Sequence, residues 1–309
     1  MGKWRNKKKS KMFRYRKCHS LIESDTVYCK ELLTTKNTFE DIRNLSVCRY
    51  RSLDDAEQNR LYSSLENGEA ILNEENQICT YMYAYGNMHK AKLLSAFEAF
   101  PDISSKVNII DWSCGQGIAS MIFLEKYGCG SVNHITLIEP SEIALKRAAL
   151  HCKKYCPDIS LKTICKEINN VKKQDFSHSK SAVTIHLFSN ILDMHCYSQE
   201  KLIELLKKIQ SGVNYFVCVS PYINATRAQK LETFKTHFQN NYHGTYALLE
   251  EQTNTKDLNN SFWYCNNRYK DRENPFPHGR YTDCDNLHSS NGCSKKWTRD
   301  IKVFKVILE

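Results

Sequence analysis

From residue 107 to residue 238 the chain alternates short apolar runs with amphipathic segments, and this alternation limits the fold more than any other feature. Strands that alternate with helices predict an α/β fold, a mostly parallel sheet with helices on both faces. The predicted strands are 107–111, 134–139, 159–164, 182–188 and 214–220, and the predicted helices are 118–128, 141–155, 198–209 and 227–238.

The segments on either side of this alternation have different patterns. Apolar residues at helical spacing predict a helix over 81–100, and the polar stretch 53–66 predicts a surface helix, whereas 21–50 gives mixed signals. Two more strands are predicted at 246–252 and 300–308. We therefore divide the chain into a basic flexible arm (1–20), a helical N-terminal extension (21–105) and an α/β domain (106–309) with an inserted polar loop at about 253–299.

The positive charge is concentrated at the N-terminus. The chain has 44 Lys and Arg against 34 Asp and Glu, a formal net charge of +10. Residues 1–17 hold nine basic residues and no acidic one, so the remainder, with 35 against 34, is nearly neutral. Trp4, Phe13 and Tyr15 interrupt the basic run, which favours contact with the phosphates and bases of RNA or DNA. A solubilising tail is the alternative interpretation.

Fourteen cysteines are scattered through the chain without a C-x-x-C pair. Free buried thiols in a reducing compartment account for them, and we see no secretory signal or apolar run of bilayer length. We therefore expect a cytoplasmic protein with no membrane partner. A late group of cysteines and histidines has irregular spacing for zinc, and no metal site is predicted; its members are Cys265, His278, Cys284, His288 and Cys293.

The turn after the first predicted strand carries the chemistry. The strand ends at Asp111, small residues including Gly115 and Gly117 follow, and a helix then begins. Glycine permits positive φ and lets a ligand approach the backbone closely. The start of the helix offers free N–H groups to a carboxylate or phosphate. This turn predicts a nucleotide-type ligand.

Two kinds of nucleotide ligand use such a turn. A dinucleotide needs G-x-G-x-x-G, and here Ser120 stands at the third glycine position. Asp111 instead places an anion at the strand end, which repels pyrophosphate and suits a cationic ligand. The pattern Asp111-x-Ser113-x-Gly115-x-Gly117 resembles motif I of class I S-adenosylmethionine-dependent methyltransferases, Asp-x-Gly-x-Gly-x-Gly, with Ser113 replacing the first glycine.

The resemblance implies a Rossmann-like methyltransferase fold and S-adenosyl-L-methionine as cofactor. It also implies that the acid ending the second strand, Glu139, holds the ribose, because a carboxylate accepts two hydroxyl protons. The cofactor site that it implies comprises Asp111, Ser113, Gly115, Gly117, Glu139, Pro140, Ser189 and Asn190. Further candidates are Glu167 or Asp175 for the adenine, Asp193 for a substrate or cofactor contact and His195 as a base.

The pattern identifies neither the methyl acceptor nor a catalytic residue. No Asn-Pro-Pro-Tyr or Asp-Pro-Pro-Tyr follows the fourth predicted strand, which argues against amino-directed adenine or cytosine methyltransferases. The Tyr-rich segment 81–85 resembles the mitochondrial-ribosome-associated methyltransferase-like branch, whose Cys-Pro-His motif is absent here. We expect methyl transfer to an unidentified acceptor, with nucleic acid as a candidate. An inactive cofactor-binding scaffold on RNA or protein and a nicotinamide-dependent oxidoreductase are the alternatives.

Overall fold

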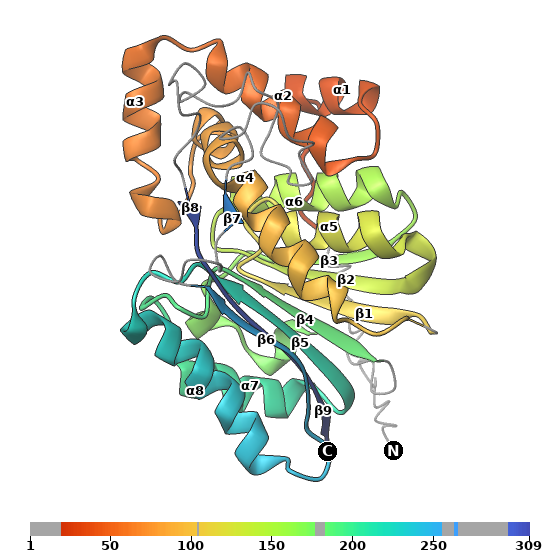
Figure 1. Ribbon diagram of the computed structural model, residues 1–309. Helices are drawn as coiled ribbons and strands as arrows, with labels where there is room; N and C mark the ends of the chain where they lie inside the picture. Colours follow the sequence, from red (N-terminus) through yellow and green to blue (C-terminus); the bar gives the residue numbers. More distant parts are fainter. Residues whose placement is uncertain (1–19, 104, 177–182, 255–262, 265–295) are drawn as a thin grey trace, which may run out of the picture.

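A seven-stranded sheet with the order β3-β2-β1-β4-β5-β9-β6 forms the centre of the computed structural model, which describes residues 20–103, 105–176, 183–254, 263–264 and 296–309 (Figure 1). Strands β1 to β5 are parallel, and β9 is antiparallel to both of its neighbours, β5 and β6. The strands are β1 (Val107–Trp112), β2 (Val132–Ile138), β3 (Ser160–Ile164), β4 (Thr184–Ser189), β5 (Gly212–Ser220), β6 (Ala247–Asn254) and β9 (Arg299–Leu308), with a separate pair β7 (Trp263–Tyr264) and β8 (Lys296–Trp297).

The helices follow the strands in the predicted alternation. They are α1 (Val27–Thr34), α2 (Phe39–Arg51), α3 (Asp55–Ser63), α4 (Glu75–Glu98), α5 (Ile118–Tyr127), α6 (Glu142–Tyr155), α7 (Gln199–Ile209) and α8 (Ala225–Asn241), with 3₁₀ turns η1 (Glu66–Gly68), η2 (Cys129–Ser131), η3 (Ile168–Asn170) and η4 (Lys173–Asp175). The side chains of Ser141 and Ser198 cap α6 and α7. The prediction of a Rossmann-like α/β fold is confirmed by this sheet and its helices.

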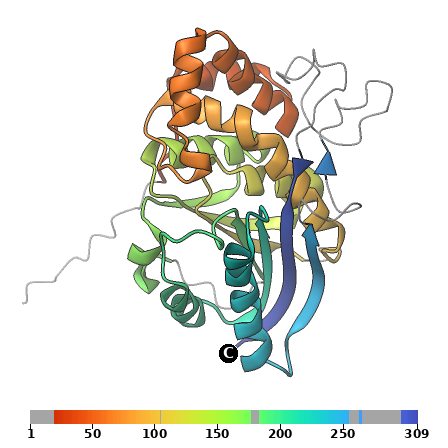
Figure 2. The same ribbon diagram turned by 60° about the vertical axis from the view of Figure 1, so that its left-hand side comes forward.

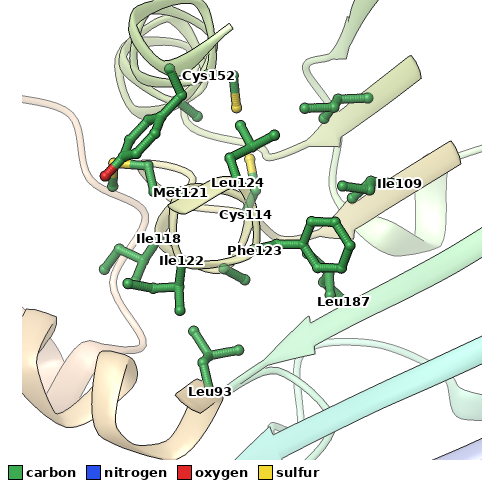
Figure 3. Close-up of a cluster of buried hydrophobic side chains, with 14 of the residues drawn as sticks. Leu93, Ile109, Cys114, Ile118, Met121, Ile122, Phe123, Leu124, Cys152 and Leu187 are labelled. Atoms are coloured by element: carbon green, nitrogen blue, oxygen red, sulfur yellow. The ribbon is translucent and has the colours of Figure 1, made fainter. Parts of the chain in front are cut away.

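Each face of the sheet has its own hydrophobic core because neighbouring residues of a buried strand point to opposite faces. On β1, Ile109 belongs to the cluster under α4, α5 and α6, whereas Ile110 belongs to the cluster under α7 and α8. Figure 1 shows these two helical layers on either side of the sheet. Figure 3 shows the first cluster, in which α4, α5 and α6 meet β1 and β4 through side chains that include Leu93, Ile118, Phe123, Cys152 and Leu187.

The N-terminal helices share this first core. Tyr28 and Phe39 belong to the same buried cluster as α5 and α6. The guanidinium of Arg147 on α6 is fully buried, pairs with Glu23 and Glu75, and lies 3.4 Å from the centre of the Tyr28 ring. This buried cation joins the N-terminal segment to α6. Figure 2 shows α1 to α3 at one end of the molecule and β6 beside β9 at the sheet edge.

The structure corrects one expectation about the cysteines. Cys129 and Cys156 form a disulfide, because η2 and the end of α6 bring them together. The prediction of free thiols throughout is therefore wrong for this pair, although eight other cysteines in the described ranges are free. The basic arm and the late Cys/His group lie outside the described residues. None of the described helices has the length and apolarity that a bilayer crossing needs.

Candidate cofactor site

A cavity of about 250 Å³ lies at the carboxyl ends of β1, β2 and β4. Open α/β sheets bind ligands at this edge, where the strand order reverses direction beside β1. Six of the predicted cofactor residues line this cavity: Ser113, Gly115, Glu139, Pro140, Ser189 and Asn190. The sheet topology therefore brings together residues that are up to 77 positions apart in the sequence.

The turn after β1 explains the spacing of its small residues. Ser113, Gly115 and Gly117 have φ of 51°, 52° and 78°, in the left-handed region. A Cβ added at Gly115 would meet nothing within 4 Å, so open space lies against its backbone. A Cβ at Gly117 would lie 3.1 Å from the Ala148 side chain. Gly117 lines no described cavity, and its missing side chain permits close packing of α5 on α6, so its part in the cofactor site stays a prediction.

Glu139 lies directly beside this turn. Its Oε2 accepts the Gly115 N–H at 2.9 Å, and its Oε1 accepts the Ser141 N–H at 3.0 Å. Each carboxylate oxygen keeps a second lone pair for a ligand. Burial raises the pKa of Glu139 to about 7, against which the two backbone N–H groups act. The acid at the end of β2 therefore faces the cavity with its position fixed by the glycine turn.

Asp111 borders a second, smaller cavity of about 30 Å³, the volume that one water molecule takes up in the liquid. Its Oδ2 accepts hydrogen bonds from the Ser120 N–H and hydroxyl, at 3.2 and 2.7 Å. Its Oδ1 is buried and has no partner in the described residues. Burial raises the pKa of Asp111 to about 7, and the nearby Glu139 contributes to the rise. An unpaired buried carboxylate oxygen is unusual and indicates a missing donor.

Four residues border both cavities: Tyr81, Ser113, Gly115 and Ser189. The small cavity is therefore continuous with the wall of the larger one. We call this boundary the junction. Its polar side chains come from α4, from the turn after β1 and from the end of β4. The His89 ring nitrogens contact the Tyr81 hydroxyl at 3.2 Å and the Ser189 hydroxyl at 3.3 Å.

The other predicted residues are divided between the cavity and the surface. Glu167 lines the cavity, whereas Asp175 pairs with Lys166 and caps its own 3₁₀ turn. His195 lines none of the described cavities and contacts Lys230 instead. The structure thus favours Glu167 over Asp175 and does not place His195 beside the ligand space.

The Asp193 side chain is buried. It accepts a hydrogen bond from the Ser220 hydroxyl at 3.0 Å and lies 3.7 Å from the Arg227 guanidinium. It lines none of the described cavities, so the structure gives it a partner within the protein in place of a ligand contact.

Sequence reasoning missed one wall of the cavity. Residues 68–72, which we call the strap, connect η1 to α4 and cover the cavity from the N-terminal side. The Glu69 carboxylate pairs with Arg227 of α8 at 2.6 Å. Three consecutive residues with positive φ, Glu66, Asn67 and Gly68, form the turn that leads into the strap, whose first residue is Gly68. The Asn-Gly pair was the available signal for this turn.

Neither a protein-family model nor a curated protein sequence matches the chain. Several solved structures are distantly similar. The plantazolicin methyltransferase BpumL with SAH is 16% identical, covers 87% of this chain and 98% of its own, and has a TM-score of 0.41. A putative RNA methyltransferase from Pyrococcus horikoshii is 13% identical, with 81% and 96% covered and a TM-score of 0.38. A SAM-dependent O-methyltransferase from Thermotoga maritima is 12% identical, with 81% and 71% covered and a TM-score of 0.40.

Proposed function

We propose that this protein binds S-adenosyl-L-methionine in the cavity and transfers its methyl group to an acceptor. One observation carries the proposal: Glu139 lies on the cavity wall, bonded to the N–H of Gly115, whose missing side chain leaves the space in front open. An acid beside a glycine turn suits a ligand that places its ribose hydroxyls on the acid and continues along the turn. The partnerless Oδ1 of Asp111 in the adjoining cavity supplies an acceptor for an ammonium group.

The residues present fit the parts of this cofactor. Glu139 would hold the ribose hydroxyls, and the apolar surfaces of Pro140, Ile168 and Ile191 suit a flat base. Asp111 would face the amino-acid moiety. When bound, the cofactor supplies a methyl group already activated by its sulfonium, so the protein mainly has to align the acceptor and exclude water. A catalytic base is therefore not a requirement of the site.

The same geometry argues against a nicotinamide dinucleotide. The pyrophosphate of such a ligand sits on the N-terminus of the first helix. Here the Asp111 carboxylate accepts the Ser120 N–H in the first turn of α5, so an anion already lies at that position. Two anions there would repel each other in a buried environment.

Titration calorimetry with S-adenosylhomocysteine tests the binding proposal, with NAD⁺ and NADH as competitors. We expect Asp111→Ala and Glu139→Ala each to weaken binding by about 1–3 kcal/mol, the scale of a lost charged partner. Glu142→Ala is the matched control, because it removes an exposed carboxylate three residues from Glu139. Equal affinity in all four proteins, or binding of NAD⁺ in place of S-adenosylhomocysteine, would refute the proposed site.

The acceptor is the finer part of the proposal. Methyl-labelled cofactor incubated with RNA, DNA and protein pools separates an enzyme from a cofactor-binding scaffold. We propose nucleic acid as the acceptor class on the basis of the basic run in residues 1–17. Deleting this run should leave cofactor affinity unchanged and lower the salt dependence of nucleic-acid binding. The cytoplasmic location and the mitochondrial-ribosome-associated branch stay predictions.

A further inference from the structure

A lysine is buried behind the junction, where a charged side chain is costly to bury. Lys92 of α4 has no exposed surface. Within the described residues its Nζ has a single hydrogen-bond acceptor, Oδ1 of Asn190. Burial lowers the pKa of Lys92 to about 7, and the buried Asp193 opposes this effect. Lys92 lines neither of the two cavities.

Asn190 is the residue through which Lys92 reaches the cavity. It follows Ser189 at the end of β4, has a φ of 59°, and lines the larger cavity. Its Nδ2 lies 2.5 Å from Nε2 and 3.1 Å from Nδ1 of His89. Lys92 Nζ donates to the amide oxygen, and the amide nitrogen lies against His89. The orientation of the amide is therefore set by its two neighbours.

The position of this amide matters for the chemistry of transfer, an argument that rests on the proposed function. In S-adenosyl-L-methionine the sulfur joins the ribose to the amino-acid chain. Glu139 lines the larger cavity and Asp111 the smaller one, so the sulfur belongs at the junction between them. Asn190 adjoins Ser189, which borders both cavities, and contacts His89 of the smaller one.

We propose that Lys92 is a positioning residue that keeps the Asn190 amide oxygen bonded to its own Nζ, so that this oxygen cannot accept a hydrogen bond from an amine at the transfer position and the site selects against such an amine. An amine or ammonium there would need a carbonyl oxygen as its partner. The Asn190 oxygen is already bonded to Lys92.

Sinefungin is a direct probe, because an amine-bearing carbon takes the place of the methylsulfonium while the rest of the molecule is unchanged. We expect wild-type protein to bind S-adenosylhomocysteine more tightly than sinefungin. Lys92→Met keeps the buried stem and removes the donor, which frees the Asn190 oxygen. The ratio of the two dissociation constants should then move toward sinefungin by about tenfold, the scale of one hydrogen bond to a charged group.

The ratio distinguishes positioning from a general loosening of the site, because a loosened site weakens both ligands alike. Lys90→Met is the matched control: the same substitution on the same helix, at a lysine that lies over the Phe39 ring outside the cavities. Tighter binding of sinefungin by wild-type protein, or an unchanged ratio in Lys92→Met, would overturn the inference. Failure of both ligands to bind wild-type protein would instead refute the proposed function.

Discussion

Asp111→Asn should make the ligand-free protein more stable while weakening its cofactor site. The Asp111 carboxylate is fully buried, and burial raises its pKa from 3.8 to about 7. A group whose pKa is raised in the folded state resists ionisation there, so its ionised form opposes folding. The three-unit rise corresponds to about 4 kcal/mol at pH 8, since each unit is worth about 1.4 kcal/mol.

Asparagine fits the site with little loss of hydrogen bonding. Its amide oxygen can accept both bonds from Ser120, and its amide nitrogen takes the place of the partnerless Oδ1. The pH dependence has a defined sign. Well below pH 3.8 the carboxyl is protonated in both states, so the part of the stability difference that comes from its ionisation should vanish. The gap in favour of Asp111→Asn should grow by about 1.4 kcal/mol per pH unit and level off above about pH 7.

Urea unfolding followed by circular dichroism at pH 5, 6, 7 and 8 measures this gap, and we expect about 2–4 kcal/mol at pH 8. Asp102→Asn is the control, because it makes the same substitution at an exposed position outside the cavities. Calorimetry at pH 8 should show weaker S-adenosylhomocysteine binding by the Asp111 variant. A variant less stable than wild type at pH 8, or a gap that does not change with pH, would refute the reasoning.

Three more predictions concern the strap, the buried arginine and the glycine turn. Arg227→Met removes the ion pair with Glu69, so S-adenosylhomocysteine should dissociate about two- to fivefold faster in stopped-flow measurements, the scale of a partly exposed pair; an unchanged rate would show that the pair does not hold the strap. Arg147→Ala leaves Glu23 buried without its partner and should destabilise the protein by about 3–5 kcal/mol in urea unfolding, and a loss below about 1 kcal/mol would contradict the structural role given to this cation. Ser113→Gly relieves a left-handed residue and should raise stability by about 0.5–1 kcal/mol with cofactor affinity retained; a destabilised variant would show that the Ser113 side chain is needed.

The sheet could be predicted from the sequence because its strands are buried on both faces and stand out as apolar runs. The turn after β1 was predicted because Gly115 and the strand-terminal acid Asp111 lie within five residues of each other. Its Ser113 departs from the motif at a backbone position with φ of 51°, so the conformation survives the substitution. Local pattern is sufficient where the ligand site is built on strand ends.

The N-terminal part could not be predicted in the same way. Helix α4 begins at Glu75, several residues before the predicted start, because its first turns bury the polar residues Gln77 and Thr80. Gln77 donates to the Ser64 carbonyl at 3.1 Å, and Thr80 donates to the Asn76 carbonyl at 2.7 Å. In a pattern of apolar and polar residues, a buried polar residue cannot be told from an exposed one. Within the predicted helical extension, the bounds of α1 and α2 could not be assigned, because their burial depends on α5 and α6, which are distant in the sequence.

A hydrophobicity pattern does not reveal buried polar residues, and the site residues that could not be predicted are of this kind. Tyr81, His89 and Lys92 lie on a helix whose pattern indicated only an apolar face, and their meaning depends on Ser189 and Asn190, about a hundred residues later. The predicted acids and the missed lysine share one property, a pKa that burial shifts toward the neutral form. Asp111 and Glu139 are buried acids with raised pKa, and Lys92 is a buried base with a lowered one. The ionised forms of these three groups oppose folding at neutral pH. A cationic ligand binds best to ionised acids, and Asp111 and Glu139 are ionised at pH 8 and protonated at pH 5. Such a ligand should therefore stabilise the protein more at pH 8 than at pH 5.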